Sequence, residues 1–375
     1  MNLSDVRSQF PHINENKVYF NHASNGPVSN RVKERLFEYI EERNHKMILN
    51  FEKSLNASQN AKNKLSEMFS TSPDRIAWAD NVSNAISGIV QGIKWHSGDR
   101  IILNDLEFPS NVYPFLNLKP LGVKIDFVKS QNGIVNADDY EKLISPKTKL
   151  IAVSLVQFLT GYRIDIKKLG DICRQKEILF FVDGIQGGGV VNVDVEESNI
   201  DLFTGGSHKW FMGLQGASYF VISKKLQDLV HQKNVGWTSV VDPWNLLDYN
   251  LTLREDAERY QNGTLNMIGI TAFDESLNLF KEFGMNNVES HVLSNTKYFI
   301  DKLNEAGLKP LLNNVSAGNL AGIVTIETEN SKRIFLNLEK KNISCSLREG
   351  MIRFSPHYYN TKEEIDLVVE ELIIK

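Results

Sequence analysis

An acid and a lysine, each placed just after an apolar run, are the residues of this sequence best suited to chemistry. Asp183 ends the run ILFFV, which is typical of a strand buried on both faces. Lys209 follows a second short apolar piece, Ile200–Phe203, in the small-residue turn GGSHKW. If both pieces are strands, both side chains lie at the carboxyl edge of a sheet, where open α/β folds bind ligands. The carboxylate could hold a cationic ring nitrogen, and the amine could form an imine.

The residues around Lys209 favour a reactive lysine over an ordinary solvated charge. In GGSHKWFMGLQG the lysine lies between glycines, a histidine and an aromatic pair, which suits a cramped and partly desolvated pocket. Desolvation lowers the pKa of a lysine and frees its amine for a Schiff base. Taken alone, this pattern leaves a surface lysine as the alternative.

Asp183 and Gln186 would meet the needs of pyridoxal phosphate, if the pocket holds that coenzyme. Its pyridine nitrogen needs an anion, because the protonated ring is the electron sink for a carbanion, and Asp183 could be that anion. Gln186 could donate a hydrogen bond to the phenolic oxygen of the ring. Acids at strand ends also cap turns, and glutamines are common in exposed loops, so both structural alternatives stay open.

The strand-to-helix corner DNVSNAI is the candidate phosphate site. Ser83 and Asn84 are expected at a helix start, where free backbone N–H groups and the macrodipole favour an anion. The alternative is a simple N-cap. The run Gly187–Gly189 indicates a dinucleotide site only weakly, because it does not form G-x-G-x-x-G at a first strand-helix turn.

Composition leaves a role on a small molecule open. The 375 residues can form two domains, and 42% of them are apolar, as in ordinary globular proteins. A formal charge of -4 gives no reason to expect nucleic acid or an anionic membrane as partner. Cys173 and Cys345 form neither a disulfide framework nor a metal-binding spacing, so we expect the cytoplasm and no metal site. The first residues lack a signal-peptide pattern, and no apolar run reaches membrane-spanning length.

After Pro73 the sequence alternates between strand-like and helix-like stretches, which predicts a mostly parallel sheet with helices on both faces. The predicted strands are IAWA, RIILN, VKIDFV, LIAVSLV and ILFFVD. Ala217–Ser223 would add one strand, antiparallel and either inside the sheet or at its edge. Before this region, helices are expected from Ser29 to about Met47 and over Ala57–Phe69.

Three parts of the chain are expected: an N-terminal arm over residues 1–20, a large domain over 21–265 and a small α+β domain over 266–375. The arm should pack against the small domain. A long helix from about Ile268 to Phe283 would bridge to strands in AGIVTIET and GMIRFSP, and the helix KEEIDLVVEELI would close the chain.

Several motifs together resemble the class V aminotransferase group of fold-type I pyridoxal-phosphate enzymes. These are VDGIQ followed by SHKW, with EFPSNVYP upstream, GTLN later and IRFSPHYYNT near the end, so that the resemblance extends from Asn21 to Thr361. The group includes cysteine desulfurases and isopenicillin N epimerase-like proteins. The resemblance implies a large domain whose mostly parallel sheet is sandwiched by helices, a small C-terminal α+β domain and pyridoxal 5'-phosphate as cofactor.

The resemblance also implies residue roles. Lys209 matches the Schiff-base lysine, Asp183 the partner of the pyridine nitrogen and Gln186 the donor to the phenolic oxygen. Ser83, Asn84, Ser207 and His208 match residues that hold the phosphate. Thr264 matches a residue that reaches the phosphate of the neighbouring subunit, which implies a homodimer with shared sites. Arg353 matches the arginine that grips the α-carboxylate of the substrate, a task for its bidentate geometry.

Departures from the desulfurase pattern bear on the reaction. Phe108 stands where desulfurases stack a histidine on the ring, and phenylalanine cannot shuttle protons. Cys345 lies in a strand-like stretch without the long loop that carries their sulfur-accepting cysteine, so a packed core cysteine is the favoured interpretation. Phe158 replaces an asparagine near the ring oxygen.

If Phe158 cannot make that contact, Gln157 or Gln186 would have to supply it. His22 and Arg163 are candidate substrate contacts, with a structural role equally open for each.

The sequence thus predicts a pyridoxal-phosphate enzyme acting on a small amino acid, with an aminotransferase favoured. A cysteine desulfurase or C–S lyase and an epimerase remain alternatives within this coenzyme class. A binding or accessory protein with the same fold is the non-enzymatic alternative, and the joint presence of Lys209, Asp183 and Arg353 argues against it.

Overall fold

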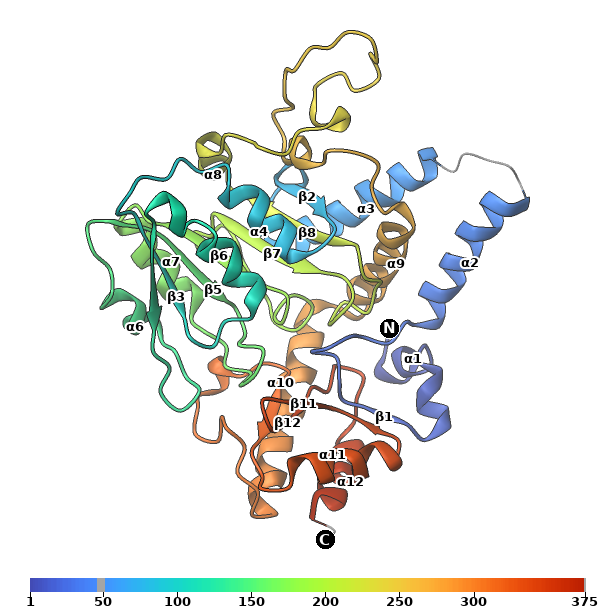
Figure 1. Cartoon of the computed structure of the whole chain (residues 1–375). Coiled ribbons are helices and arrows are strands. Elements are labelled where there is room, and N and C mark those ends of the chain that lie inside the picture. The colour runs from blue at the N-terminus through green and yellow to red at the C-terminus, as the bar shows by residue number, and fades with distance from the viewer. Residues whose placement is uncertain (46–50, 374–375) are drawn as a thin grey trace.

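A seven-stranded sheet forms the centre of the computed structural model, which describes residues 1–45 and 51–373 (Figure 1). The strand order is β2-β8-β7-β6-β5-β3-β4, and among these strands only β8 runs antiparallel to the others. The strands are β2 (Ile76–Ala79), β3 (Arg100–Asn104), β4 (Lys124–Val128), β5 (Thr148–Ser154), β6 (Leu179–Asp183), β7 (Leu202–Gly206) and β8 (Ser218–Ile222). The predicted parallel sheet is confirmed, and the strand expected over Ala217–Ser223 lies inside it, antiparallel.

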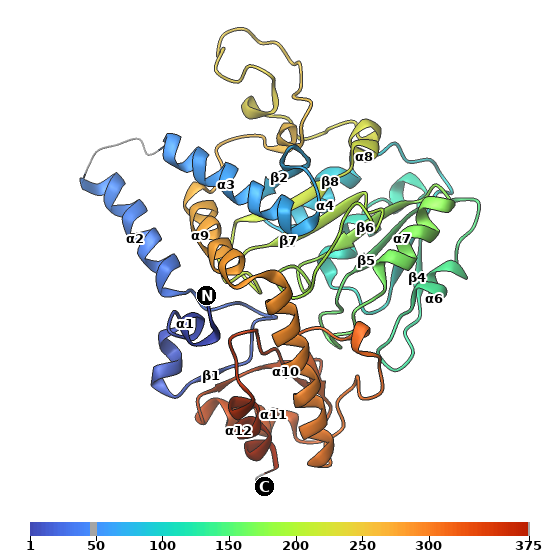
Figure 2. The same cartoon turned by 180° about the vertical axis from the view of Figure 1, so that it is seen from behind.

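Helices cover both faces of this sheet, as the two opposite views show (Figures 1 and 2). The helices of this region are α3 (Phe51–Phe69), α4 (Val82–Val90), α5 (Tyr113–Leu116), α6 (Ala137–Glu141), α7 (Ile166–Gln175) and α8 (Lys224–Leu229). Leu179 and Phe181 of β6 belong to the core under α4, α5 and α8, whereas Phe180 and Val182 belong to the core under α3, α6 and α7. Successive side chains of a strand point to opposite faces, so a strand covered on both sides must be apolar throughout.

The N-terminal helices extend differently from the prediction. The first, α2 (Asn30–His45), was expected to end near Met47, a residue outside the described ranges. The second, α3, already runs from Phe51, whereas apolar periodicity placed its start at Ala57. Its early buried position is Ser54, a small polar residue that a search for apolar periodicity does not detect.

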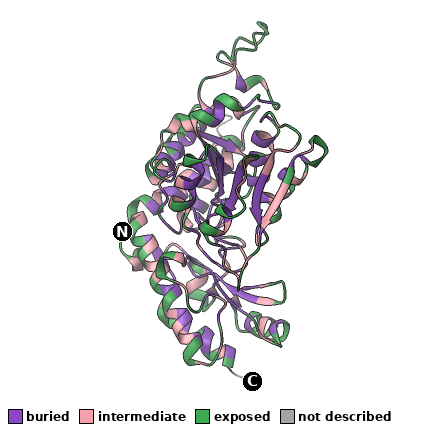
Figure 3. Ribbon diagram, turned by 90° about the vertical axis from the view of Figure 1, so that its left-hand side faces the viewer, coloured by how far each residue is buried: buried purple, intermediate pink, exposed green. Residues whose placement is uncertain are grey.

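The C-terminal part forms a second layered unit below the large sheet (Figures 1 and 3). Its antiparallel sheet has the order β11-β12-β9, with β9 (Val324–Ile326), β11 (Ser346–Arg348) and β12 (Met351–Phe354). Its helices are α10 (Met285–Glu305), α11 (Ser331–Lys340) and α12 (Lys362–Ile373). Helix α9 (Met267–Phe283) packs against α3 and α2 beside the large sheet and leads into α10. The bridging helix, the closing helix and the strands in AGIVTIET and GMIRFSP are confirmed. In contrast, α10 and α11 were not predicted.

The N-terminal residues pack on this C-terminal unit. The short helix α1 (Leu3–Arg7) places Arg7 in an ion pair with Glu364 at 2.9 Å. Strand β1 (Val18–Tyr19) pairs in parallel with β10 (Ile343–Ser344). These contacts bring the two ends of the chain together, while the domain boundaries at residues 20/21 and 265/266 stay predictions.

The segment 235–253 projects from the large unit at the top of Figure 1, in yellow. Unlike most loops, it exposes large apolar side chains: Val235, Trp237, Val241, Trp244, Leu246, Leu247, Tyr249 and Leu251. Exposed apolar patches often serve as contact sites for another molecule. No helix in the described ranges combines the length and apolar character required to cross a lipid bilayer.

Candidate active site

Asp183 and Lys209 meet at the carboxyl edge of the large sheet, as the sequence predicts. Asp183 is the last residue of β6 and pairs with Thr204 of the parallel neighbour β7. Lys209 lies three residues beyond Gly206, where β7 ends. The two side chains are close enough that the charge of each acts on the pKa of the other.

Asp183 has one carboxylate oxygen that no described residue contacts. The side chain is 2% exposed, and its Oδ1 accepts a hydrogen bond from the Ile185 N–H at 2.9 Å, while Oδ2 has no partner among the described residues. Burial raises the pKa of Asp183 to about 6, against the opposing effects of the Ile185 N–H and the Lys209 charge. A buried acceptor without a partner costs about 1–3 kcal/mol. A protonated ring nitrogen would satisfy this oxygen, so the residue fits the pyridine of pyridoxal phosphate.

Lys209 has the properties of a nucleophilic amine. Burial lowers its pKa to about 8, although the Asp183 carboxylate acts in the opposite direction, and the charges of Arg353 and Arg348 lower it further. Its Nζ lies 5.8 Å from the centroid of the Phe108 ring. At a pKa near 8, about a tenth of the amine is unprotonated at pH 7.

The turn NHASNGP packs behind this lysine. The Gly26 N–H donates to the His208 carbonyl at 2.7 Å, and a Cβ atom on Gly26 would lie only 2.2 Å from the Lys209 carbonyl oxygen. The small residues of this turn therefore allow a close backbone approach, and the group approached is the Lys209 main chain.

The corner predicted to bind an anion lies at the start of α4, and its cap differs from the expected one. Asn81 is the N-cap, and its side chain accepts from the Asn84 N–H at 2.8 Å. The N–H groups of Val82 and Ser83 have no acceptor among the described residues. The Ser83 hydroxyl donates to Ser110 Oγ at 2.8 Å. The free amides of Val82 and Ser83, more than that of Asn84, can receive a phosphate.

Ser207 and His208 shape the turn that carries the lysine. The Ser207 hydroxyl donates to the Leu214 carbonyl at 2.5 Å, which closes the turn after β7. His208 is half-buried, and burial, together with the Lys209 charge, lowers its pKa to about 4. It is therefore a neutral imidazole near pH 7.

Arg353 is a buried cation without a counter-ion. It is 2% exposed and donates to Ser346 Oγ at 3.2 Å, to the Phe158 carbonyl at 2.7 Å and to Ser24 Oγ at 2.8 Å. Within the described ranges no carboxylate lies within ion-pair distance of it. Burial and the charge of Arg348 lower its pKa to about 10. Because an unpaired buried charge is costly, this guanidinium fits a carboxylate that arrives with a ligand.

The family model that matches this chain is aminotransferase class-V, over residues 18–368. The chain belongs to this family. It is 27% identical to the "uncharacterized aminotransferase YcbU" of Bacillus subtilis, over 87% of this chain and 86% of the relative. It is 26% identical to a probable cysteine desulfurase of Methanothermobacter thermautotrophicus, over 99% and 98% of the two chains.

A solved structure of C-DES, a variant with glycine covalently linked to its PLP cofactor, has the same fold. It superposes with a TM-score of 0.89 at 22% identity and covers 98% of this chain and 99% of that one. The predicted family, its fold and the class of pyridoxal-phosphate transferase are therefore confirmed.

Gln186 of this class V aminotransferase family member makes two hydrogen bonds within the chain. Its Nε2 donates to the Ala23 carbonyl at 2.9 Å, and its Oε1 accepts from Trp210 Nε1 at 2.8 Å, so the residue braces the turn around Ala23. The amide carries a second N–H, and its donation to the ring oxygen stays a prediction. Gln157, the other candidate for the ring oxygen, donates to Glu107 at 3.2 Å, and its Oε1, an acceptor, lacks a partner among the described residues.

His22 does not present a free nitrogen to a substrate. Its Nδ1 lies 2.8 Å from the Ser355 carbonyl oxygen and its Nε2 lies 3.0 Å from the Tyr359 hydroxyl. Burial lowers its pKa well below the usual value. Arg163 forms an ion pair with Glu289 at 2.9 Å. Both side chains have structural partners, and Ser24 is the residue of the His22 turn that reaches Arg353.

Cys345 lies between β10 and β11 and is buried in the hydrophobic core, with 5% of its surface exposed. Burial raises its pKa to about 12. The interpretation as a packed core cysteine agrees with this geometry. Phe108 and Phe158 stack edge to face at 5.3 Å between ring centroids, which gives this edge of the site an apolar wall.

Thr264 lies outside the lysine pocket. It is exposed and lines a cavity of 460 Å³ together with Asp80 and Asn84 near the start of α4. Neither Asp183 nor Lys209 lines this cavity. The side chain of Thr264 is therefore accessible to a second molecule.

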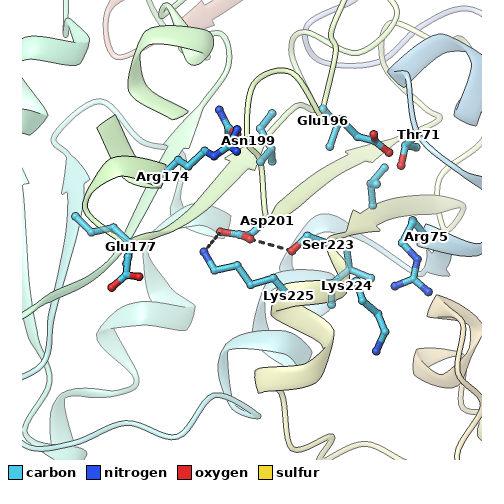
Figure 4. Close-up of a pocket in the computed structure, with 15 residues that line it drawn as sticks. Thr71, Arg75, Arg174, Glu177, Glu196, Asn199, Asp201, Ser223, Lys224 and Lys225 are labelled. Carbon is cyan, nitrogen blue, oxygen red and sulfur yellow. Dashed lines mark hydrogen bonds and ion pairs between the residues drawn. The ribbon is translucent and has the colours of Figure 1, made fainter. Parts of the chain in front are cut away.

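A cavity of 600 Å³ lies at the opposite edge of the large sheet, around the start of β7 (Figure 4). Its acid Asp201 accepts from the Phe180 N–H at 3.0 Å and from Ser223 Oγ at 2.9 Å, and lies 3.6 Å from the Lys225 amine. These polar groups already satisfy one another, and the cavity contains none of the residues that meet at Lys209. We therefore assign no chemistry to it.

Proposed function

We propose that this chain is a pyridoxal-phosphate enzyme that acts at the α-carbon of an amino acid, with transamination as its reaction. The observation that carries the proposal is Arg353, a buried guanidinium without a carboxylate partner among the described residues, close enough to Lys209 to lower the pKa of its amine. An amino acid supplies the carboxylate for the arginine, and its α-carbon then lies near the amine. No other pair of cations in the described chain combines these properties.

The residues around Lys209 suit the cofactor. Bound pyridoxal phosphate supplies the electron sink that acidifies the α-carbon of an amino acid. Asp183 Oδ2 would accept the ring N–H, and the free amides of Val82 and Ser83 would hold the phosphate. Lys209 would accept the α-proton as a general base and return it as an acid.

Transamination is favoured over sulfur transfer by the position of Cys345. Its thiol lies in the core, and its raised pKa keeps it protonated near pH 7, whereas a sulfur acceptor must be a mobile thiolate. A cysteine desulfurase or C–S lyase is the second candidate, because a relative that aligns with 99% of the chain is named a probable cysteine desulfurase. A lyase that releases sulfur without a protein thiol is compatible with the buried position of Cys345. An epimerase is a further alternative, because it uses the same proton transfer at Lys209.

We infer that two copies of the chain form a homodimer in the cytoplasm. The projecting segment 235–253 carries Trp244, Leu247 and Tyr249 into solvent, and exposed Thr264 follows it in the chain. A second copy would cover this apolar surface. Thr264 of one copy would then reach the cofactor site of the other copy. Leu247→Asp should convert a dimer to a monomer in analytical ultracentrifugation. Leu229→Asp, on exposed α8, should leave the mass unchanged, and a wild-type monomer would refute the homodimer.

The function is tested by absorbance of the purified protein with pyridoxal phosphate and a panel of amino acids and oxoacids. A visible band that converts to the pyridoxamine form with an amino acid, and returns with an oxoacid, supports transamination. A protein that acquires no visible band refutes every coenzyme-dependent activity. A band that stays while cysteine yields sulfide favours the desulfurase or lyase alternative.

A further inference from the structure

A second arginine lies beside Arg353 on the same face of the small sheet. In the β11–β12 ladder Ser346 pairs with Arg353, and Arg348 pairs with Met351. Side chains two apart in a strand point to one side, and directly paired residues share a face, so Arg348 and Arg353 project from the same side of the hairpin.

The turn of this hairpin fixes the position of Arg348. Glu349 and Gly350 connect the strands, and both have left-handed backbones, with φ of 47° and 79°. Positive φ at both central residues is typical of a type I′ turn, which matches the twist of the paired strands. The arginine therefore sits at a defined point of a regular hairpin rather than on a long loop.

Both arginines converge on one hydroxyl. Arg353 donates to Ser24 Oγ at 2.8 Å and Arg348 donates to the same atom at 3.4 Å. The positive charge of Arg348 acts on both Arg353 and Lys209, so it belongs to the electrostatic environment of the site although its side chain is exposed. Among the described residues, Arg348 has no carboxylate at ion-pair distance.

Among the described residues, the charges of the site leave one cation without a partner. Glu107 raises the pKa of Asp183, and a protonated ring nitrogen would match the Asp183 carboxylate. The α-carboxylate of an amino acid would neutralise Arg353. Arg348 then still faces the substrate side of the hairpin without an anion.

We propose that Arg348 binds a second anionic group, so that the preferred substrate is an amino acid with an acidic side chain, either a carboxylate or a sulfinate. This rests on the proposed function and specifies its substrate class. Arg353 would hold the α-carboxylate deep in the site, and Arg348 would receive the distal anion at its exposed mouth. Arginine suits both positions, because its planar fork pairs with two oxygens of one anion.

The test compares wild type with Arg348→Gln in the cofactor-loaded protein, with the substrate concentration for half-maximal spectral change as the measurement. Wild type should respond to glutamate, aspartate or cysteine sulfinate at lower concentrations than to alanine. Arg348→Gln should raise the value for the acidic substrate about 10- to 100-fold and change the value for alanine by a much smaller factor. The best of the three acidic substrates identifies the distal anion.

Arg333→Gln is the matched control, because Arg333 is another exposed arginine of the same unit, on α11. Arg333→Gln should change neither the half-maximal concentration for the acidic substrate nor that for alanine. Equal losses for alanine and glutamate in Arg348→Gln, or a wild type that does not prefer acidic substrates, would overturn the proposal. A protein that responds to no amino acid would instead contradict the proposed function, so the two failures are distinct.

A binding measurement without turnover gives a second readout. Calorimetry of the cofactor-loaded protein should detect succinate, with its two carboxylates, more strongly than propionate, which has one. Arg348→Gln should remove the advantage of succinate and keep the weak binding of propionate. Equal affinities of wild type for the two acids would count against a second anion site.

Discussion

Asp183 and Lys209 stand at the carboxyl ends of adjacent parallel strands, and the charge of each offsets part of the cost of burying the other. The carboxylate raises the pKa of the amine, and the ammonium lowers the pKa of the acid, while burial acts in the opposite direction on both. Burial dominates, so the amine titrates near 8 and the acid near 6. A ring nitrogen that protonates beside Asp183 and an aldehyde that consumes the Lys209 amine would relieve both penalties.

Covalent attachment of pyridoxal phosphate should occur at Lys209. Borohydride reduction of the loaded protein should add the mass of the cofactor to the peptide that contains Lys209, and Lys209→Ala should abolish this label. Lys62 is an internal control, since it is also buried but is paired with Glu258. Cofactor label on the peptide that contains Lys62, or any label on the Lys209→Ala variant, would contradict Lys209 as the attachment site.

The reaction of the cofactor-free protein with pyridoxal phosphate should accelerate with rising pH and reach half its limiting rate near pH 8. Only the unprotonated amine attacks the aldehyde, so the rate is lost as the pH falls below the pKa of Lys209. Arg353→Met removes a nearby positive charge and should move the midpoint upward, whereas Asp183→Asn should move it downward. Arg163→Gln should not move it, because Arg163 is paired with Glu289 elsewhere. Stopped-flow absorbance measures these midpoints.

The sheet and the place of its site were predictable because they rest on local patterns. A strand such as Leu179–Asp183 has to be apolar on both faces once helices cover both sides, and the alternation of such strands with helices leaves a parallel sheet as the arrangement. The carboxyl edge then brings Asp183 and Lys209 together. Helix α10 was not predicted from apolar periodicity. Its buried face includes the polar residues Asn295 and Thr296 beside Val292 and Phe299, which weakens the periodic pattern.

The hydrogen-bond partners of Gln186 and His22 within the chain could not be predicted, because they come from distant segments. The Gln186 amide bonds to the Ala23 carbonyl and to Trp210, and the His22 ring lies against the Ser355 carbonyl and the Tyr359 hydroxyl. No spacing in the sequence records such pairings. The signal for Arg348 was present in REGMIR, where a two-residue turn between strands would put both arginines on one face, but it requires the strand boundaries to be known.

Asp183→Asn should weaken the affinity of the protein for pyridoxal phosphate about 10- to 100-fold, because a hydrogen bond to a charged group is replaced by a neutral one. The asparagine can still accept from the Ile185 N–H, so the fold should persist. Asp201→Asn is the matched control, since Asp201 is a buried acid at the opposite edge of the same sheet. It should reduce stability without changing cofactor affinity. Equilibrium dialysis of both variants decides this, and equal affinities for wild type and Asp183→Asn would exclude the carboxylate as the partner of the ring.

Cys345→Ala should leave turnover of the preferred amino acid unchanged, because the thiol is buried in the hydrophobic core. The loss of one buried sulfur should lower the free energy of unfolding by about 1 kcal/mol, a typical cost of a core substitution. Cys173→Ala, at the other buried cysteine on α7, should behave alike in both measurements. Turnover and sulfide release from cysteine are measured for both variants beside urea unfolding. Sulfide or persulfide formation that disappears in Cys345→Ala and survives in Cys173→Ala would establish a cysteine relay and replace transamination with desulfuration.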